Sequence, residues 1–555
     1  MFRPGRAPVR LGGRSGPGGP SRGPLLGRAA AAMRWQGADW RRIQSFWRIG
    51  LFLLVGLLVR WRFVAQSAYP LGEGGLFYYV IQYVADHGAL PVEIPYYSGG
   101  IPFVYPPLGF LSYGAIVRYT SLSLLTVMRW ASFLFSSLSL FVFAALARRF
   151  LREVAWEFAV LSFATLPSTV WHTAASDSVR NLAFVLLLAG AFFAHGALTE
   201  QRGWRWTAAA GLLLGLTALV HPPAALGLGL IVALFTIYYG VEWGGRGLLV
   251  GGSIGGLAAI VMLPWFLFLY RSHGPGFVAM LRNGFFSRPH ATIWLFSLLK
   301  FGPTREPFAH LWAVLGVVGV ICAWVAGNGL LALWFLITPL HWSDHIYSLP
   351  LALGAGWSIG EVILPWMRAR VVHSWRAVAA VLLCALLFYA TLGATTPADY
   401  REMQPQVTKA RLEAWEWMSD HLAADSWVTI VGEDSEWVPA MAQVCSNIPQ
   451  GAEWTGQFVD YAWMYNALVS VPTYDELLRI LRHYRQPIAY LYVSTPPGSG
   501  SWDGRDGEWV YHSEGEPLRH RQAFRRSVEQ QACVQRVYEN EEVVLFDLRA
   551  CDLSW

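Results

Sequence analysis

The stretch from residue 69 to residue 108 reads YPLGEGGLFYYVIQYVADHGALPVEIPYYSGGIPFVYPPL and directly follows the first apolar run of the chain. It holds three carboxylates and six prolines, which are Glu73, Asp86, Glu93, Pro70, Pro91, Pro95, Pro102, Pro106 and Pro107. Inside a bilayer every backbone N–H and C=O must be paired within the chain, and so many polar and proline residues prevent that pairing. The stretch is therefore predicted to lie at the membrane surface or above it, with surface helices over 76–87 and 106–120.

Glu73 is a candidate catalytic residue because of its position. It stands between glycines, in Leu71-Gly72-Glu73-Gly74-Gly75, just past the end of the first apolar run. A carboxylate at this place would face a substrate carried by a membrane lipid. An acidic residue in a solvated loop is the alternative interpretation.

Apolar runs long enough, or nearly long enough, to cross a bilayer recur along the chain. We place eleven of them, near 48–66, 124–147, 155–172, 180–197, 206–220, 224–240, 248–270, 311–326, 329–341, 349–366 and 376–393. The chain is 54% hydrophobic with a mean hydropathy of +0.36. These values fit an α-helical polytopic membrane protein with a soluble part better than a globular enzyme.

Arginines in the connecting segments predict the topology. If the N-terminus is inside, the inward loops are 147–153, 199–206, 242–247, 327–329 and 367–376, and most of them carry an arginine excess. Cytoplasmic loops are rich in Lys and Arg, whereas a further span at 106–122 would put these loops outside. We therefore predict a multi-pass protein of the inner (plasma) membrane with a cytoplasmic N-terminus and an extracytoplasmic C-terminus.

Three regions follow from composition. Residues 1–45 are rich in Gly, Pro and Arg and are predicted to form a disordered basic cytoplasmic arm, residues 46–393 a transmembrane domain, and residues 394–555 an extracytoplasmic α/β domain. In the last region helical spacing covers 408–422 and 474–484, strands are expected over 427–434 and 488–494, and a hairpin over 534–548. This region carries a net charge of −11 and the remainder +17, which argues against nucleic acid as a partner.

The five cysteines have no metal-ligand spacing. Cys322 and Cys384 fall in apolar runs, whereas Cys445, Cys533 and Cys551 lie in the C-terminal region. An odd number there leaves at least one thiol unpaired, and the sequence does not decide which cysteines would pair.

Charged residues gather at the outward ends of the predicted spans. They are Glu73, Asp177, Arg180, His221, Arg271, Arg282, Arg288, Lys300, Arg305, His341, Asp344 and His345. Carboxylates beside several cations suit a site that activates a hydroxyl nucleophile and holds a phosphate-linked leaving group. The planar fork of arginine matches phosphate oxygens and offsets the charge that develops on them.

Each candidate also has a structural interpretation. Asp177 and Arg180 are three residues apart, so they could form an ion pair at a helix start. His221 before Pro222-Pro223 could simply end a span. The arginines could be solvated surface charges, and His341, Asp344 and His345 have the residue types of a metal site but lack a further ligand.

The chain also resembles a known family. The first outward loop with its acid, Phe77-Tyr78-Tyr79 and Tyr105-Pro106-Pro107-Leu108 are similar to segments of the GT-C membrane glycosyltransferases, the relatives of protein O-mannosyltransferases and aminoarabinose transferases. Their second outward loop also carries an acid, and here it reads Ala175-Ser176-Asp177-Ser178-Val179-Arg180-Asn181. The resemblance covers about residues 48–393 and extends weakly to Glu436-Trp437-Val438-Pro439 and Gly451-Ala452-Glu453-Trp454.

The resemblance implies an inverting transfer of a sugar from a polyprenyl-phosphate carrier to a protein, lipid or glycan acceptor on the non-cytoplasmic face. Glu73 takes the place of the family's catalytic base, and Asp177 that of the second acid, which orients the acceptor or a metal. The residues expected to bind substrate or phosphate are Tyr105, Arg180, His221, Arg282, Arg288, Arg305 and His345. No cofactor is assigned, a divalent metal is left open, the expected partners are membrane lipids, and an envelope protein complex is left open as well.

Two other functions are weighed against this one. Gly74 follows Glu73, so the acidic pair usual in the family is missing, which favours a non-catalytic membrane scaffold that binds another envelope protein. Tyr105 stands where a lysine is common in aminoarabinose transferases, which argues against that sugar. A lipid or sugar transporter is the third function, but no inverted halves are evident and the charges lie at one face.

Overall fold

The computed structural model describes residues 45–65, 67–70, 74–166, 169–170, 178–199, 203–286, 309–338, 344–372, 375–393, 406–432, 434–447, 454–456, 458–495 and 516–552. The chain divides into two compact units, residues 1–50 and 51–555. Of the first unit only residues 45–50 are described, and they are helical. The disordered arm predicted over 1–45 therefore lies almost entirely outside the described residues.

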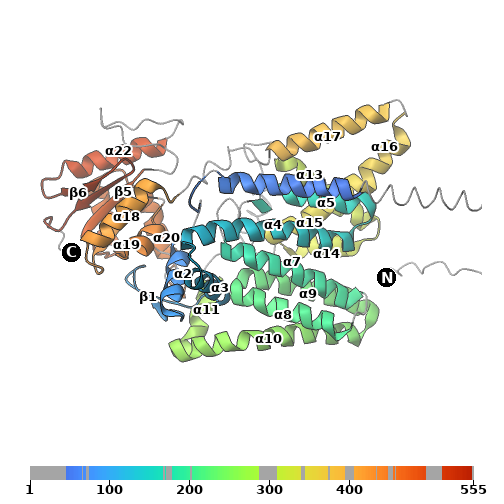
Figure 1. The fold of residues 1–555 in the computed structure, drawn as a ribbon, viewed down its shortest axis with the longest axis horizontal. Helices are drawn as coiled ribbons and strands as arrows, with labels where there is room; N and C mark the ends of the chain where they lie inside the picture. The colour runs from blue at the N-terminus through green and yellow to red at the C-terminus, as the bar shows by residue number, and fades with distance from the viewer. Residues whose placement is uncertain are drawn as a thin grey trace, which may run out of the picture. The chain divides into compact units, whose positions relative to one another are not determined.

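Helices dominate the second unit up to residue 393. After the helical residues 51–65 and the first loop segment come α4 (Leu124–Phe150), α5 (Glu153–Thr165), α7 (Ser178–Thr199), α8 (Trp204–Val220), α9 (Pro222–Trp243), α10 (Gly245–His273), α11 (Phe277–Phe286), α13 (Ala309–Val325), α14 (Gly329–Ile337), α15 (Asp344–Trp357), the π-helical turn η3 (Ser358–Ile363), α16 (Leu364–Arg370) and α17 (Arg376–Gly393). Each of the eleven predicted apolar runs overlaps a described helix, although the ends of the runs at 155–172 and 329–341 lie outside the described residues. Figure 1 shows α4, α7, α8, α9 and α10 lying side by side.

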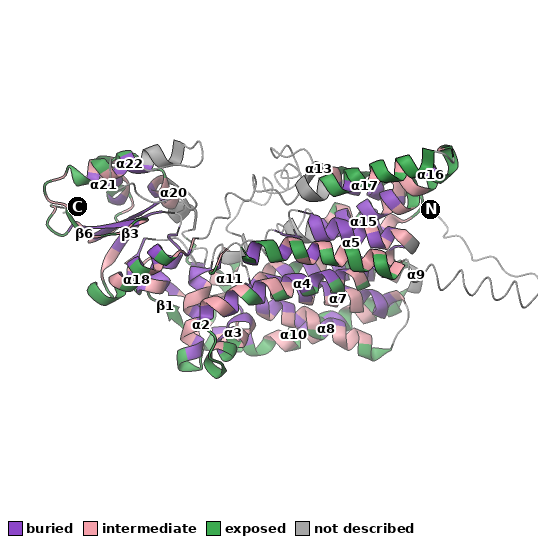
Figure 2. Ribbon diagram, turned by 45° about the horizontal axis from the view of Figure 1, so that its top comes forward, coloured by how far each residue is buried: buried purple, intermediate pink, exposed green. Residues whose placement is uncertain are grey.

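Among the described residues, five helices are long and apolar enough to cross a membrane, at Leu124–Phe150, Ser178–Thr199, Pro222–Val241, Gly245–Asn283 and Ser348–Arg370. Other apolar helices are shorter, so the count of eleven crossings stays a prediction. The exposed faces are apolar as well. Figure 2 shows α16 and much of α17 as exposed, and on α17 the exposed side chains include Val381, Leu382 and Phe388. Helices with apolar outer faces suit contact with lipid.

Small and polar residues join these helices. A Cβ on Gly319 of α13 would overlap the carbonyl oxygen of Gly354 on α15, so the two backbones approach closely. Such small-residue contacts are typical of helices packed in membranes. Arg60 is fully buried and donates hydrogen bonds to Ser136 Oγ (2.9 Å) on α4 and to the Ala164 carbonyl (2.9 Å) on α5, which ties the first helix to its neighbours.

The segment that opens the sequence contains α2 (Gly75–His87), the short strands β1 (Glu93–Ile94) and β2 (Ile101–Pro102), and α3 (Leu108–Tyr119). The two helices predicted over 76–87 and 106–120 are therefore confirmed. β1 and β2 pair antiparallel, and α2 packs against α3. α2 ends where Gly88 adopts a left-handed conformation (φ 70°) and its N–H bonds the Val84 carbonyl, a common helix stop.

The C-terminal part, residues 406–552, alternates helices and strands. Its elements are α18 (Lys409–His421), β3 (Trp427–Val431), α19 (Trp437–Ala442), β4 (Cys445–Ser446), α20 (Phe458–Val469), α21 (Tyr474–His483), β5 (Tyr490–Ser494), α22 (Glu516–Glu529), β6 (Gln535–Glu539) and β7 (Val543–Asp547). The strands form one sheet of order β4-β3-β5-β7-β6. Strand β3 is parallel to both of its neighbours, β4 and β5, whereas β7 is antiparallel to both of its neighbours, β5 and β6. Both predicted helices, both predicted strands and the predicted hairpin are confirmed.

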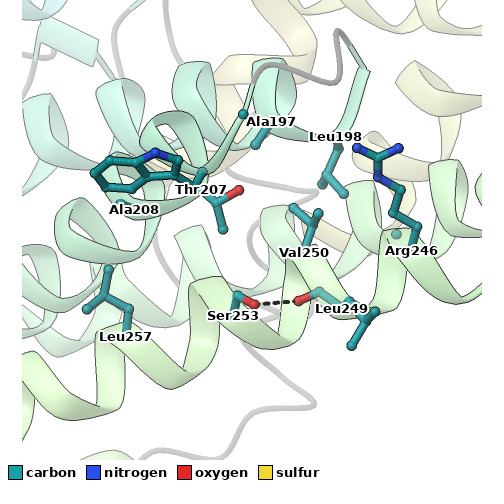
Figure 3. A pocket seen from close by; sticks show the side chains of 12 residues that line it. Ala197, Leu198, Thr207, Ala208, Arg246, Leu249, Val250, Ser253 and Leu257 are labelled. Atoms are coloured by element: carbon teal, nitrogen blue, oxygen red, sulfur yellow. Dashed lines mark hydrogen bonds between the residues drawn. The ribbon is translucent and has the colours of Figure 1, made fainter.

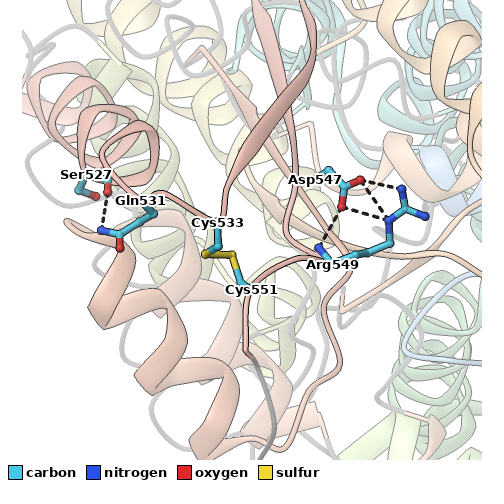
Figure 4. The surroundings of a disulfide bond; sticks show 6 residues. All are labelled: Ser527, Gln531, Cys533, Asp547, Arg549 and Cys551. Carbon is cyan, nitrogen blue, oxygen red and sulfur yellow. Dashed lines mark hydrogen bonds and ion pairs between the residues drawn. A yellow bond between two sulfur atoms is a disulfide. The ribbon is translucent and has the colours of Figure 1, made fainter.

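A disulfide joins Cys533, just before β6, to Cys551, just after β7 (Figure 4). Cys445, Cys322 and Cys384 are free thiols. The bond closes the end of the β6–β7 hairpin, and Cys551 packs against the apolar core formed by α21, α22 and the sheet.

Candidate active site

The structure describes four of the nine predicted site residues with their side chains: Tyr105, Arg180, His221 and Arg282. Glu73, Asp177, Arg288 and Arg305 lie outside the described residues. His345 lies in the helix α15, but its side chain is not described. The geometry of the site is therefore given by the described residues next to them.

Tyr105 and His221 are brought together from segments 116 residues apart. The Tyr105 hydroxyl lies 2.6 Å from His221 Nδ1, and the two rings stack with centroids 6.1 Å apart. His221 is the extended residue (φ −155°, ψ 109°) between α8 and α9, since Pro222 begins the next helix. The pair places a hydroxyl and an imidazole, both half-buried, where α8 ends and α9 begins. One proton is used in their mutual hydrogen bond, so either His221 Nε2–H or the Tyr105 hydroxyl remains to donate to an oxygen atom of a substrate.

Aromatic rings from three segments surround Tyr105. Its ring centroid lies 5.2 Å from Phe77 of α2, 5.4 Å from Phe110 of α3 and 6.1 Å from Trp454, which is 7% exposed. Rings at these distances gain from edge-to-face packing. The first loop segment and the C-terminal part therefore meet at Tyr105.

The start of α7, which carries Arg180, packs against α3. The Tyr113 hydroxyl donates to the Ser178 carbonyl at 2.9 Å, and a Cβ on Gly109 would lie 3.1 Å from Val179 Cγ1. Asp177 directly precedes this turn of α7, and Glu73 precedes Gly74 and α2, which also packs against α3. The described residues that follow the two predicted acids thus contact the same short helix.

Arg282 is the exception among the described candidates. It is exposed on α11 and makes no hydrogen bond or ion pair with the other described site residues. Its neighbour Asn283 lies close to Gly456, because a Cβ there would come within 2.9 Å of Asn283 Nδ2. The structure therefore brings Tyr105 and His221 together and leaves Arg282 on the surface near residues 454–456.

Glu436 and Trp437 are neighbours of the site to which the sequence assigned no role. The Leu76 N–H, in the first turn of α2, points to Glu436 Oε1 at 3.4 Å, and the Tyr97 hydroxyl donates to the Glu436 carbonyl at 2.7 Å. A Cβ at Gly75 would overlap that carbonyl oxygen and lie 2.7 Å from Trp437 Cα. The glycine pair Gly74-Gly75 was the sequence signal of this close approach.

Buried charges hold the turn that presents Glu436. The Asp434 carboxylate accepts hydrogen bonds from the hydroxyls of Tyr492 and Ser494, and its carbonyl accepts the Trp437 N–H at 2.9 Å. Arg411 Nε lies 3.6 Å from Asp434 and 3.0 Å from Glu542. Burial raises the pKa of Tyr492 well above its ordinary value. This hydroxyl therefore stays protonated and donates the hydrogen bond to the Asp434 carboxylate.

A metal site is not formed within the part of the chain that the structure describes, where no three His, Cys, Asp or Glu side chains come together. Glu73, Asp177 and His341 lie outside that part. The divalent metal left open by the sequence therefore stays untested.

No protein-family model and no curated protein sequence gives a significant match to the chain. Solved structures do resemble it. The archaeal oligosaccharyltransferase AglB from Archaeoglobus fulgidus, in complex with an inhibitory peptide and a dolichol-phosphate, matches with a TM-score of 0.56 at 11% identity over 90% of this chain and 80% of that chain. ArnT from Cupriavidus metallidurans bound to undecaprenyl phosphate matches with 0.53 at 16% identity over 91% and 99% of the two chains.

The arabinofuranosyltransferase AftD from mycobacteria matches with a TM-score of 0.51 at 14% identity, over 90% of this chain and 41% of that chain. All three similarities span nine-tenths of this chain, although so few residues are identical. The chain therefore has the GT-C fold, the fold shared by these membrane glycosyltransferases.

Proposed function

We propose that the protein is a membrane glycosyltransferase that moves a sugar from a polyprenyl-phosphate carrier to a hydroxyl group of an acceptor on the extracytoplasmic face. The fold supports this proposal. The single observation that carries it is the contact between Tyr105 and His221 beside α3, because the described residues following both predicted acids, Glu73 and Asp177, also pack on α3.

In the proposed reaction the Glu73 carboxylate accepts the proton of the acceptor hydroxyl. The acceptor oxygen forms a bond to the anomeric carbon as the bond from that carbon to the phosphate oxygen breaks, so the configuration inverts and the polyprenyl phosphate leaves with the electron pair. Asp177 orients the acceptor. Positioning both reactants and stabilising the charge on the leaving phosphate supply most of the acceleration.

Cations and donors at the same end of the helices would hold the phosphate. Arg180 and the Tyr105–His221 pair are assigned to it, and Arg282, Arg288, Arg305 and His345 are proposed to assist. Two of the similar structures contain such a lipid phosphate, a dolichol-phosphate in AglB and undecaprenyl phosphate in ArnT. An oligosaccharyltransferase from Archaeoglobus fulgidus is also solved tethered to an acceptor peptide, which supports protein as one acceptor class beside lipid and glycan.

We place the C-terminal part, as a domain over 394–555, outside the cytosol of a protein with eleven crossings of the inner (plasma) membrane and a cytoplasmic N-terminus. The Cys533–Cys551 disulfide supports this placement, because such bonds persist in oxidising compartments and are rare in the cytosol.

The test replaces Glu73 by Gln and measures sugar transfer in membranes that contain a labelled polyprenyl-phosphate sugar. Loss of a general base lowers the rate by about 100- to 10,000-fold. Glu93→Gln is the matched control, because Glu93 is an exposed carboxylate of the same loop segment. Full transfer by Glu73→Gln would remove Glu73 from the reaction and the proposal with it.

A non-catalytic scaffold is the second candidate, favoured by Gly74 in place of a second acid. It predicts that wild-type and Glu73→Gln proteins alike transfer no sugar and that both retrieve the same envelope protein from solubilised membranes. Transfer by the wild type alone excludes it.

A further inference from the structure

Glu436 contacts the first loop segment with two different groups. Its carboxylate oxygen Oε1 lies 3.4 Å from the Leu76 nitrogen, and its carbonyl accepts the Tyr97 hydroxyl at 2.7 Å. Leu76 and Glu436 are 360 residues apart in the chain. Because Glu436 is only 9% exposed, both contacts form inside packed structure, where water competes little for the N–H and hydroxyl groups.

The start of α2 has no acceptor of its own for these N–H groups. Gly74 precedes the helix without a side-chain cap, and no acidic residue stands in its first turn. The first N–H groups of a helix have no partner within the helix, so their acceptor must come from elsewhere. Glu436 supplies that acceptor from the C-terminal part, and an acidic side chain is favoured at the positive end of a helix.

The turn that presents Glu436 is fixed by the sheet of the C-terminal part. The carbonyl of the fully buried Asp434 accepts the Trp437 N–H at 2.9 Å. The Asp434 carboxylate accepts the hydroxyls of Tyr492 and Ser494, both on β5. These bonds set the position of Glu436 independently of its contact with α2, so α2 is the partner that is held.

This turn leaves the sheet where the order of the strands reverses. Along the chain, β3 is followed by β4 on one side and then by β5 on the other. In open α/β sheets the crevice beyond such a strand is the usual place for a ligand. Here the start of α2 packs against the turn, since an added Cβ on Gly75 would overlap the Glu436 carbonyl and one on Gly74 would lie 3.3 Å from Trp437 Cζ2.

We propose that Glu436 is a positioning residue for the sugar transfer assigned to Glu73. Only Gly74 stands between Glu73 and the first residue of α2, so the start of α2 determines where the chain that carries Glu73 ends. A misplacement of about 1 Å at a reacting group can cost roughly 100-fold in rate. This role rests on the proposed function, because Glu436 acts through Glu73.

The test measures sugar transfer per folded protein by Glu436→Ala and Glu436→Gln in membranes that contain a labelled polyprenyl-phosphate sugar. Glu436→Ala removes the acceptor of the Leu76 N–H, and its kcat is expected to fall about 100-fold while the KM for the carrier stays unchanged. Glu436→Gln retains an acceptor oxygen and is expected to restore kcat close to the wild-type value. A merely structural residue would change the amount of folded protein and leave its kcat unchanged.

Two control variants each remove one side-chain hydrogen bond elsewhere and are expected to keep kcat. In Ser527→Ala the C-terminal part loses the hydroxyl that accepts the Tyr474 N–H at 2.8 Å, at the start of α21. In Ser253→Ala the membrane part loses the bond to the Leu249 carbonyl at 2.8 Å. Figure 3 shows this bond in a cavity at the starts of α8 and α10, at the opposite end of α8 from His221.

Hydrogen exchange of the peptide 71–80 reports the contact without sugar transfer. Loss of one hydrogen bond is expected to speed exchange in the first turn of α2 about tenfold in Glu436→Ala, but not in Glu436→Gln or in the two controls. Unchanged exchange or an unchanged kcat in Glu436→Ala would overturn the role of Glu436 alone. Absence of transfer by the wild type would instead overturn the proposed function, and this role with it.

Discussion

Gly75 is the residue at which α2 and the C-terminal part come closest. The backbone of Glu436 and Trp437 occupies the space where a Cβ would stand, and both of these residues are buried. The contact lies two residues after Glu73, so it fixes the point at which the first loop re-enters regular structure. A side chain at position 75 must push the C-terminal part away from α2.

Gly75→Ala is therefore expected to lower the free energy of unfolding by about 1–3 kcal/mol, the cost of forcing a methyl group into packed backbone. Thermal unfolding followed by tryptophan fluorescence in detergent measures it. The control is Gly229→Ala within α9, because no atom lies within 4 Å of its added Cβ and helix propensity favours alanine by about 1 kcal/mol. Equal unfolding temperatures of wild type and Gly75→Ala would show that this contact does not form.

Among the elements, the turn between β3 and α19 is held by charged and hydroxyl side chains that other elements supply. Arg411 comes from α18, Tyr492 and Ser494 from β5, and Glu542 from the turn before β7. Two carboxylates face one buried arginine, so the group carries an excess negative charge when both ionise. Burial raises the pKa of Glu542, and the nearby Asp434 carboxylate acts in the same direction, while Arg411 opposes both.

This pKa shift has a defined sign. Because the folded state holds the Glu542 proton more tightly than the unfolded chain does, the stability from this residue is present at low pH and is lost as pH rises above about 4.3 through its raised pKa. Glu542→Gln cannot ionise, so its unfolding temperature relative to wild type is expected to rise over that window. Urea or thermal unfolding from pH 4 to pH 8 measures the difference.

Glu541→Gln is the control, since Glu541 is the exposed neighbour of Glu542 in the same turn. A difference between Glu542→Gln and wild type that stays constant with pH would mean that Glu542 is solvated in the folded protein.

At the scale of the whole molecule, the stability of the C-terminal part depends on the side of the membrane on which it folds, because the Cys533–Cys551 disulfide forms only in an oxidising compartment. Cys533 and Cys551 are 18 residues apart, and closing a loop of that size stabilises a protein by about 3 kcal/mol. The bond holds the β6–β7 hairpin against the core around α21 and α22. A C-terminal part on the oxidising side gains this stabilisation.

When free thiols are alkylated during membrane isolation, the purified protein is expected to carry three alkylated cysteines out of five, as counted by intact mass. When the disulfide is reduced before alkylation, all five are expected to be alkylated. Cys533→Ser is expected to lower the unfolding temperature, whereas Cys384→Ser, which removes an exposed free thiol, leaves it unchanged. Alkylation of all five cysteines without reductant would contradict the proposed extracytoplasmic placement.

The predictable features of this protein are local ones. α21 shows this, because Thr473 accepts the Glu476 N–H at 3.3 Å as an N-cap and Leu477 and Leu481 recur on one buried face, both within one short stretch of sequence. The hairpin of β6 and β7 follows from Asn540, whose side chain accepts the N–H groups of Glu542 and Val543. Neighbours in sequence supply these interactions, so pattern alone located them.

The sequence by itself determined the positions of the apolar helices, of α2 and α3 and of most of the C-terminal elements, because apolar periodicity and caps act within a few residues. Only the tertiary structure decided that Tyr105 pairs with His221, that Leu76 meets Glu436 across 360 residues, and that Cys533 bonds Cys551 and leaves Cys445 free. Those contacts depend on how segments far apart in the chain pack, and no local pattern records that packing.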